Sequence, residues 1–242
     1  MQNILNSDQL KAFYHDGFVS DQIQHFHDLL GQKLGRTDAG NPIIVDLGGG
    51  VGFFADGLKR SFGYDVRIVD MDPVSIASCK HKGLEATLGD AVTYKPKRDE
   101  KVACFNLILH HLIGKSAAQT YALQVKAITN WRLENRFVFV NEYIYESFIP
   151  GFSGWVIYAI TSSRLLSTIA KLVSKFVPSL KANTFGIGVR FRSNNEWLEI
   201  FRRSGFVVAS VKDGREEMVS LALRLLLIRS IKRNSYLLTS NS

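Results

Sequence analysis

Glycines alternate behind an acid in the run Asp46-Leu47-Gly48-Gly49-Gly50-Val51-Gly52, directly after the apolar residues 43–45. Glycine has no Cβ atom, so a backbone with Gly48, Gly50 and Gly52 can turn sharply and lie close to a ligand. The N–H groups of such a loop, and of a helix that begins after it, favour electron-rich ligand groups. The pattern therefore predicts a nucleotide-like cofactor at the end of a buried strand.

Two common nucleotide sites do not fit this loop. The dinucleotide fingerprint needs glycine at its first, third and sixth positions, and the sixth position counted from Gly48 is the bulky Phe53. The loop also contains no Gly-Lys-Ser/Thr sequence, which excludes a P-loop here. NAD, FAD and a P-loop nucleotide are thus disfavoured.

Polar residues also stand at the ends of three later segments that are expected to be strands. Asp70 stands about 20 residues after Gly48, the spacing at which an acid on the second strand binds a ribose diol. The three segments and their polar ends are 66–69 with Asp70, 85–88 with Gly89-Asp90-Ala91, and 102–109 with His110-His111. Four strand ends therefore carry groups that could bind a ligand.

In these residues the chain resembles the class I S-adenosylmethionine (SAM)-dependent methyltransferases, over residues 40–146 by motif and elsewhere in outline. The resemblance implies that SAM is the cofactor. It assigns the methionine end to Asp46, Gly48, Gly50 and Gly52, the ribose hydroxyls to Asp70, the adenine to Asp90 and Ala91, and the surroundings of the methyl group to Asn106 and the Leu109-His110-His111-Leu112 run. The chain lacks the Asn/Asp-Pro-Pro-Tyr/Phe box and the Pro-Cys dipeptide of nucleic-acid methylases.

The fifth strand is expected at 136–140, and the polar residues Asn141, Glu142 and Tyr143 follow it. Ligands of open parallel sheets bind at the carboxyl ends of the strands, so these three residues are pocket candidates. Candidates for proton removal are His111, His110, Glu142 and Tyr143, and Asn141 is a candidate substrate contact. A structural histidine pair is the alternative for His110 and His111.

Two segments are expected to surround the pocket. Residues 1–40 predict a helical cap, with two short helices interrupted at Gly17, in which Tyr14 could reach the substrate. Residues 150–188 predict an insertion between strands five and six with one amphipathic helix that ends before Pro178. We interpret this insertion as a substrate lid carrying Trp155 and Tyr158, and a helix on a membrane surface is the alternative.

The C-terminal part is expected to complete the fold. Residues 206–211 and 221–228 predict an antiparallel terminal hairpin, after a helix that begins with the capping box Ser193 to Glu196. Arg190 is a candidate carboxylate anchor in the substrate pocket. The fold class is α/β, Rossmann-like, with a seven-stranded mostly parallel sheet, and residues 1–242 are expected to form a single domain.

Composition agrees with one globular enzyme of 242 residues, 46% hydrophobic and 21% charged. The two cysteines, Cys79 and Cys104, have no metal-ligand spacing, so no metal is expected. No signal peptide and no transmembrane segment are predicted, and the location is expected to be cytoplasmic. The net charge of +8 is scattered along the chain, which favours an anionic or carrier-bound small substrate over nucleic acid.

These observations predict a SAM-dependent methyltransferase acting on an O or N nucleophile of a small molecule, in specialised metabolism. One alternative is a cyclase that releases methylthioadenosine from SAM and forms azetidine-2-carboxylate. Another is an RNA-modifying methyltransferase or a non-catalytic SAM-binding partner.

Overall fold

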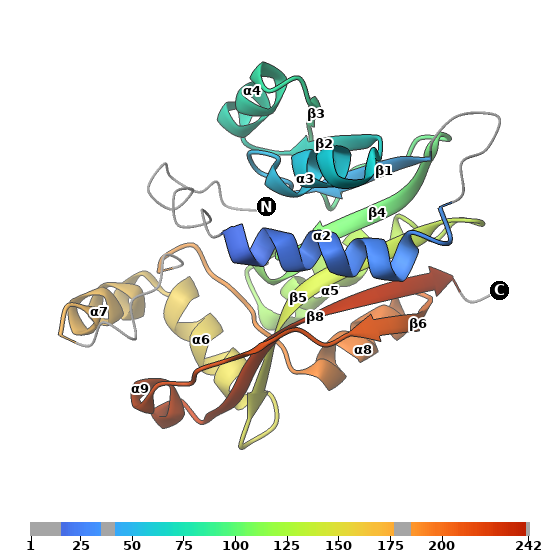
Figure 1. Ribbon diagram of the computed structural model, residues 1–242. Coiled ribbons are helices and arrows are strands. Elements are labelled where there is room, and N and C mark those ends of the chain that lie inside the picture. Colours follow the sequence, from blue (N-terminus) through green and yellow to red (C-terminus); the bar gives the residue numbers. More distant parts are fainter. Residues whose placement is uncertain (1–15, 35–41, 177–184, 241–242) are drawn as a thin grey trace.

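The computed structural model describes residues 16–34, 42–176 and 185–240. Its strands form a mixed sheet in the order β3-β2-β1-β4-β5-β8-β6 (Figure 1). A short β7 pairs with β8. Strands β1 to β5 are parallel to one another, whereas β8 runs antiparallel to both β5 and β6. The predicted Rossmann-like α/β fold class is confirmed, with the two-residue β7 in addition.

The strands are β1 (Ile43–Leu47), β2 (Val66–Asp70), β3 (Glu85–Leu88), β4 (Glu100–Asn106), β5 (Phe137–Ser147), β6 (Phe206–Lys212), β7 (Glu216–Glu217) and β8 (Ile228–Ser240). The described α-helices are α2 (Asp16–Leu30), α3 (Phe53–Phe62), α4 (Pro73–His81), α5 (Ala117–Thr129), α6 (Phe152–Ser162), α7 (Arg164–Ser174), α8 (Asn194–Arg203) and α9 (Leu221–Leu225), and Leu109–His111 forms the 3-10 helix η1.

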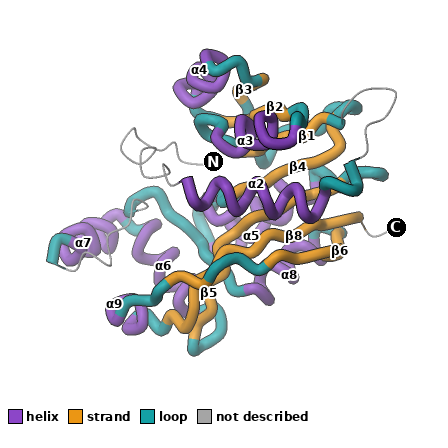
Figure 2. The backbone as a smooth tube through the Cα atoms, in the orientation of Figure 1, coloured by secondary structure: helices purple, strands orange, loops and turns teal. Residues whose placement is uncertain are grey.

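Helices cover both faces of this sheet, as the tube in Figure 2 shows. On one face, Phe26 of α2 and Phe54 of α3 pack on Phe139 of β5 with edge-to-face and stacked rings. On the other face, Ile128 of α5 and Trp197 of α8 join the larger apolar cluster. Because every central strand is buried on both sides, the carboxyl edge of the parallel strands is where the sheet can meet a ligand.

Two expectations about strands were wrong. The fifth strand does not end at residue 140: β5 continues to Ser147, so Asn141, Glu142 and Tyr143 lie within it and alternate between its faces. Residues 221–228 are not the last strand, because Ser220 caps the short helix α9 with a bond from Leu223 N–H to its hydroxyl. The antiparallel partner of β5 is the following segment, β8.

The helix of the 150–188 segment is broken, which also differs from the prediction. Helices α6 and α7 meet at an angle of 100° around Ser163. Ser163 has an extended backbone and its hydroxyl accepts from Leu166 N–H, which starts α7 as a separate helix. The apolar residues expected on one stripe therefore belong to two helices with different directions.

Gly17 is the second residue of α2, which begins at Asp16, and the first of the two expected N-terminal helices lies outside the described residues. Ser193 is the N-cap of α8 as predicted, with a complete Ser193–Glu196 capping box, and Asp72 is the N-cap of α4. The proposed substrate contact Tyr14 lies outside the described residues.

Candidate functional site

The glycine loop after β1 has three residues in the left-handed region: φ is 70° at Gly48, 53° at Gly50 and 82° at Gly52. A Cβ on Gly48 would lie 2.5 Å from Ile108 Cγ1, and one on Gly52 would lie 2.8 Å from Leu84 Cδ1. A Cβ on Gly50 would meet nothing within 4 Å. Two of the glycines thus allow close packing, while Gly50 leaves space on the open side of the loop.

Asp46 lies beneath this loop and is buried, with 1% of its surface exposed. Its Oδ1 accepts from Asn106 Nδ2 at 3.2 Å, but Oδ2 has no partner within the described part of the chain. Burial raises the pKa of Asp46 to about 7; the Asn106 hydrogen bond opposes this shift, and the charge of Asp70 adds to it. A buried carboxylate oxygen without a donor fits a cationic group that the protein itself does not provide.

Asp70 ends β2 and shapes the same loop. Its Oδ2 accepts from Gly50 N–H at 2.8 Å and its Oδ1 accepts from Asp72 N–H at 2.8 Å. Its pKa is raised by burial, against the effect of these backbone hydrogen bonds. Each oxygen retains a second lone pair, so the Asp70 carboxylate can still accept from two adjacent hydroxyls.

Asp90 stands at the end of β3, as the sequence predicts. Its Oδ1 accepts from Val92 N–H at 2.7 Å, which holds the turn after the strand, and the neighbouring Ala91 is buried. Asp46 and Asp70 lie at the carboxyl ends of β1 and β2, and Asp90 follows β3, so the three acids stand at one edge of three neighbouring parallel strands.

A histidine and a carboxylate form the second part of the site. Nδ1 of His110 lies 2.6 Å from Oε2 of Glu142, and Oε1 of Glu142 accepts from Leu109 N–H at 2.6 Å. Ile108, directly before η1, is the residue that a Cβ on Gly48 would strike, so this pair adjoins the glycine loop. Glu142 thereby fixes both the backbone of η1 and the orientation of the His110 ring.

His111 follows on η1 and is half-buried. Burial, with a smaller effect of the neighbouring His110, places its pKa well below the usual value of 6.5. Its ring centroid lies 4.2 Å from that of His110. A neutral imidazole at this position can accept a proton at pH 7.

Aromatic rings gather beside this pair. Phe191 stacks on Tyr145 with ring centroids 4.2 Å apart, and Tyr143 lies edge-on to His110 at 5.9 Å. Burial, followed by the charge of Glu217, raises the pKa of Tyr143 to about 12, so its hydroxyl is protonated at neutral pH. Tyr145 and Phe191 were not predicted as site residues. The two-residue alternation of β5, which places Tyr145 on the face of Tyr143, is the sequence signal for Tyr145.

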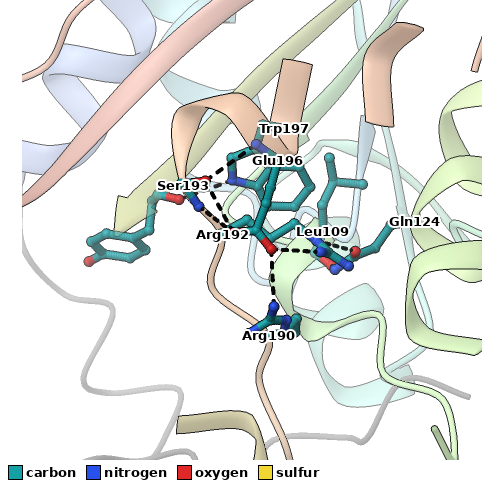
Figure 3. Close-up of polar contacts among 8 residues, drawn as sticks. Leu109, Gln124, Arg190, Arg192, Ser193, Glu196 and Trp197 are labelled. Carbon is teal, nitrogen blue, oxygen red and sulfur yellow. Dashed lines mark hydrogen bonds and ion pairs between the residues drawn. The ribbon is translucent and has the colours of Figure 1, made fainter. Parts of the chain in front are cut away.

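Arg190 and Arg192 flank Phe191, and both guanidinium groups pair with Glu196 instead of joining the aromatic rings. Figure 3 shows both guanidinium groups at Glu196, at 3.0 Å for Arg190 and 3.3 Å for Arg192. Arg192 also donates to Gln124, and Gln124 Nε2 donates to the carbonyl of Leu109. These hydrogen bonds connect η1 to α5 and to the segment that contains Arg192. Phe191 lies among the aromatic rings, and alternation directs Arg190 away from them. The Nη1 atom of Arg190 is buried and has no partner among the described residues.

The remaining substrate candidates, Tyr158, Trp155 and Asn141, have different surroundings. Tyr158 of α6 donates to the carbonyl of Gly114 at 3.3 Å, which ties α6 to the segment after η1, whereas Trp155 is 54% exposed. Asn141 accepts from Gln22 of α2 and donates to Ser235 of β8, so both ends of its amide are used within the protein. A substrate role for these residues stays a prediction.

A Gly-Lys-Ser sequence at 114–116 precedes α5. It is not part of a P-loop motif, because the first position of that motif falls on Leu109 and not on glycine. Ser116 caps α5 through Gln119 N–H, and Gly114 N–H donates to Thr120. These hydrogen bonds give Gly114 and Ser116 structural roles at the start of α5.

Solved structures share this architecture over most of the chain. A SAM-dependent methyltransferase from Thiobacillus denitrificans, solved with S-adenosylhomocysteine, covers 100% of both chains at 15% identity with a TM-score of 0.56. The chain has the class I methyltransferase fold. With 1,6-didemethyltoxoflavin-N1-methyltransferase from Burkholderia thailandensis the TM-score is 0.59, at 12% identity over 97% of this chain and 83% of the other. A structure described as a pericyclic reaction enzyme matches with a TM-score of 0.56 at 13% identity, over 88% of this chain and 47% of the other.

Sequence similarity to curated proteins is limited to a part of this fold. Trans-aconitate 2-methyltransferase of Mycobacterium tuberculosis (strain ATCC 25177 / H37Ra) is 37% identical over 68 residues, which is 28% of this chain and 26% of that relative. The enzyme of the same name from Mycobacterium marinum is 32% identical over 94 residues, 38% of this chain and 35% of the relative. The match thus spans about a quarter to a third of these relatives. No protein-family model matches the chain.

Proposed function

We propose that this protein is a SAM-dependent methyltransferase that acts on a small molecule with an oxygen or nitrogen nucleophile. The observation that carries the proposal is Asp46, a buried carboxylate below a glycine loop with one oxygen that lacks a donor. The α-amino group of SAM or S-adenosylhomocysteine is a cation that would satisfy this oxygen and lower the pKa of Asp46 from about 7.

The other residues of the carboxyl edge fit the remainder of the cofactor. Asp70 keeps lone pairs for two ribose hydroxyls, and Asp90 with Ala91 provides an acid next to a small buried residue for the adenine. Gly50 leaves open space where a side chain would otherwise stand. Bound SAM would supply an electrophilic methyl group on its sulfonium, so the protein has to position the acceptor and, for some acceptors, remove a proton.

We assign proton removal to His111, because its low pKa keeps the ring neutral at pH 7 and it is less buried than His110. His110 is a positioning residue, since Glu142 and Phe191 hold its ring. Tyr143, Tyr145 and Phe191 form an apolar wall that would exclude water from the acceptor. Hydroxyl and amine acceptors would depend on His111, whereas a carboxylate acceptor would need no base.

The relatives named for trans-aconitate make polycarboxylates the first acceptors to test, followed by phenolic and heteroaromatic compounds of specialised metabolism, free or bound to a carrier. The protein would be incubated with SAM, with and without each acceptor, and the products identified by mass spectrometry. Formation of S-adenosylhomocysteine that requires an acceptor supports the proposal. Methylthioadenosine formed from SAM alone would replace it with the cyclase alternative, since only cyclisation releases that product without an acceptor.

A further inference from the structure

Helix α7 shows an unusual distribution of side chains around its axis. The side that packs on the protein consists of small residues, Ser163, Ser167, Ala170 and Ser174, and Ser167 is the residue of α7 that is buried. The Ser167 hydroxyl donates to the carbonyl of Ile160 at 2.8 Å and lies 3.2 Å from that of Thr161. The contact of α7 with α6 is therefore short-range and largely polar.

The opposite side of α7 is apolar and faces outward. Five large residues of α7 share it, with Phe176 just after the helix, and all six are between 40% and 81% exposed: Leu165, Leu166, Ile169, Leu172, Val173 and Phe176. A helix of a soluble domain normally turns such a stripe toward the core. Contiguous exposed apolar surface of this kind marks an interaction site.

Cations lie along the third side of α7. Arg164, Lys171 and Lys175 are exposed and spaced to share one side of the helix. No aspartate or glutamate occurs anywhere between Glu146 and Glu196. The segment that forms α6 and α7 therefore contributes positive charge and no negative charge to this surface.

The same end of the molecule exposes further apolar residues. Figure 1 shows α6, α7 and α9 together at this end, and the Ser153 hydroxyl of α6 donates to the Leu226 carbonyl after α9 at 2.8 Å. The exposed residues here are Phe148, Ile149, Phe152, Trp155, Met218, Leu221 and Leu225. Tryptophan is enriched at membrane–water interfaces, and Trp, Phe and Leu form the apolar side of helices that lie in such an interface.

We propose that α7 and the adjoining end of α6 bind the surface of a bilayer that contains anionic lipids. An amphipathic helix with a basic side and large apolar residues lies in the interface plane, with its apolar side among the acyl chains. A second copy of this chain would bring like charges together, which disfavours self-association through this surface. No single described helix is long and apolar enough to cross a membrane, although α6 and α7 together would meet that length.

The test is co-sedimentation of the full chain with vesicles of phosphatidylcholine alone and of phosphatidylcholine with phosphatidylglycerol. We expect binding to the anionic vesicles that weakens as salt is added. The double variant Leu172→Ser with Phe176→Ser should bind at least about tenfold more weakly, because two apolar side chains no longer enter the interface. Lys171→Glu with Lys175→Glu should also lower binding, and only to anionic vesicles.

Val207→Ser with Val211→Ser is the matched control, since both valines are about as exposed as Val173 but lie on β6. Its vesicle binding should equal that of the wild type. The proposal is overturned if the wild-type chain stays in the supernatant with both vesicle types, or if the α7 variants bind like the control. A dimer in sedimentation velocity that Leu172→Ser with Phe176→Ser dissociates, without vesicle binding, would assign the surface to a second copy instead.

Discussion

Nδ1 of His110 lies 2.6 Å from Oε2 of Glu142, and neither side chain is more than 5% exposed. Because the second oxygen of Glu142 accepts from Leu109 N–H, one carboxylate holds both the ring and the turn that presents His111. The charge of Glu142 favours a proton on Nδ1 of His110 and so fixes the tautomer of that ring.

Glu142→Gln should disturb the orientation of the His110 ring without changing the binding of SAM. Glutamine can still accept from Leu109 N–H, but it loses the charge that orients His110. We expect kcat to fall by about tenfold or more, with the Kd for SAM unchanged. Nitrogen NMR of the His110 ring should show the change of tautomer, and an unchanged tautomer with unchanged kcat would contradict this role.

The pH dependence should reveal the base. The pKa of His111 lies well below 6.5, so turnover of a hydroxyl or amine acceptor should be constant near neutral pH and decline only below pH 6.5. His111→Gln should lower kcat by about 10²-fold or more and remove that acid limb. The exposed His81→Gln is the control. A rate that declines already above pH 6.5 would point to another base.

Asp46→Asn should stabilise the protein without ligand. Since burial raises the pKa of Asp46 from 3.8 to about 7, the folded state binds more protons than the unfolded state between these values. The free energy of unfolding therefore decreases as the pH rises from about 4 to 7, by up to about 4 kcal/mol from this group. Denaturant unfolding at pH 8 should show the variant to be more stable than the wild type, with the difference vanishing below pH 4.

Asp70→Ala should weaken SAM binding by about 1–3 kcal/mol, the usual cost of leaving a buried hydroxyl partner unsatisfied. Asp72→Ala is a close control, because Asp72 caps α4 through Val74 and Ser75 N–H and its loss should reduce stability alone. Isothermal titration calorimetry of both variants distinguishes them. Equal affinities in the two variants would remove Asp70 from the ribose site.

The residues of the carboxyl edge could be predicted from local patterns, because Asp46 and Asp70 follow short apolar runs and Asp90 follows a short segment that ends at Gly89. The break between α6 and α7 could not be predicted from apolar spacing, since Leu165 and Leu166 continue the stripe of Tyr158 and Ala159. Ser163 was the available signal, as a serine in capping position within an apolar run.

The last strand was misassigned for a similar reason. The run 221–228 is apolar enough for either a helix or a strand, and Ser220 decides for the helix through its cap. The observed last strand, β8, contains three consecutive polar residues, Lys232, Arg233 and Asn234. They interrupt the alternation of apolar and polar residues by which a strand is predicted. The burial of β8 depends on pairing with β5, a partner distant in sequence.

The most direct test of the central claim is calorimetric titration of S-adenosylhomocysteine into the wild-type protein and into Asp46→Asn at pH 8. Binding to the wild type should be stoichiometric, and the variant should bind at least about tenfold more weakly, because its amide cannot pair with the ligand's ammonium group. Wild-type affinity should also decrease below pH 7, as Asp46 takes up a proton. A folded wild-type protein that gives no binding heat, or an Asp46→Asn variant with unchanged affinity, would contradict the account.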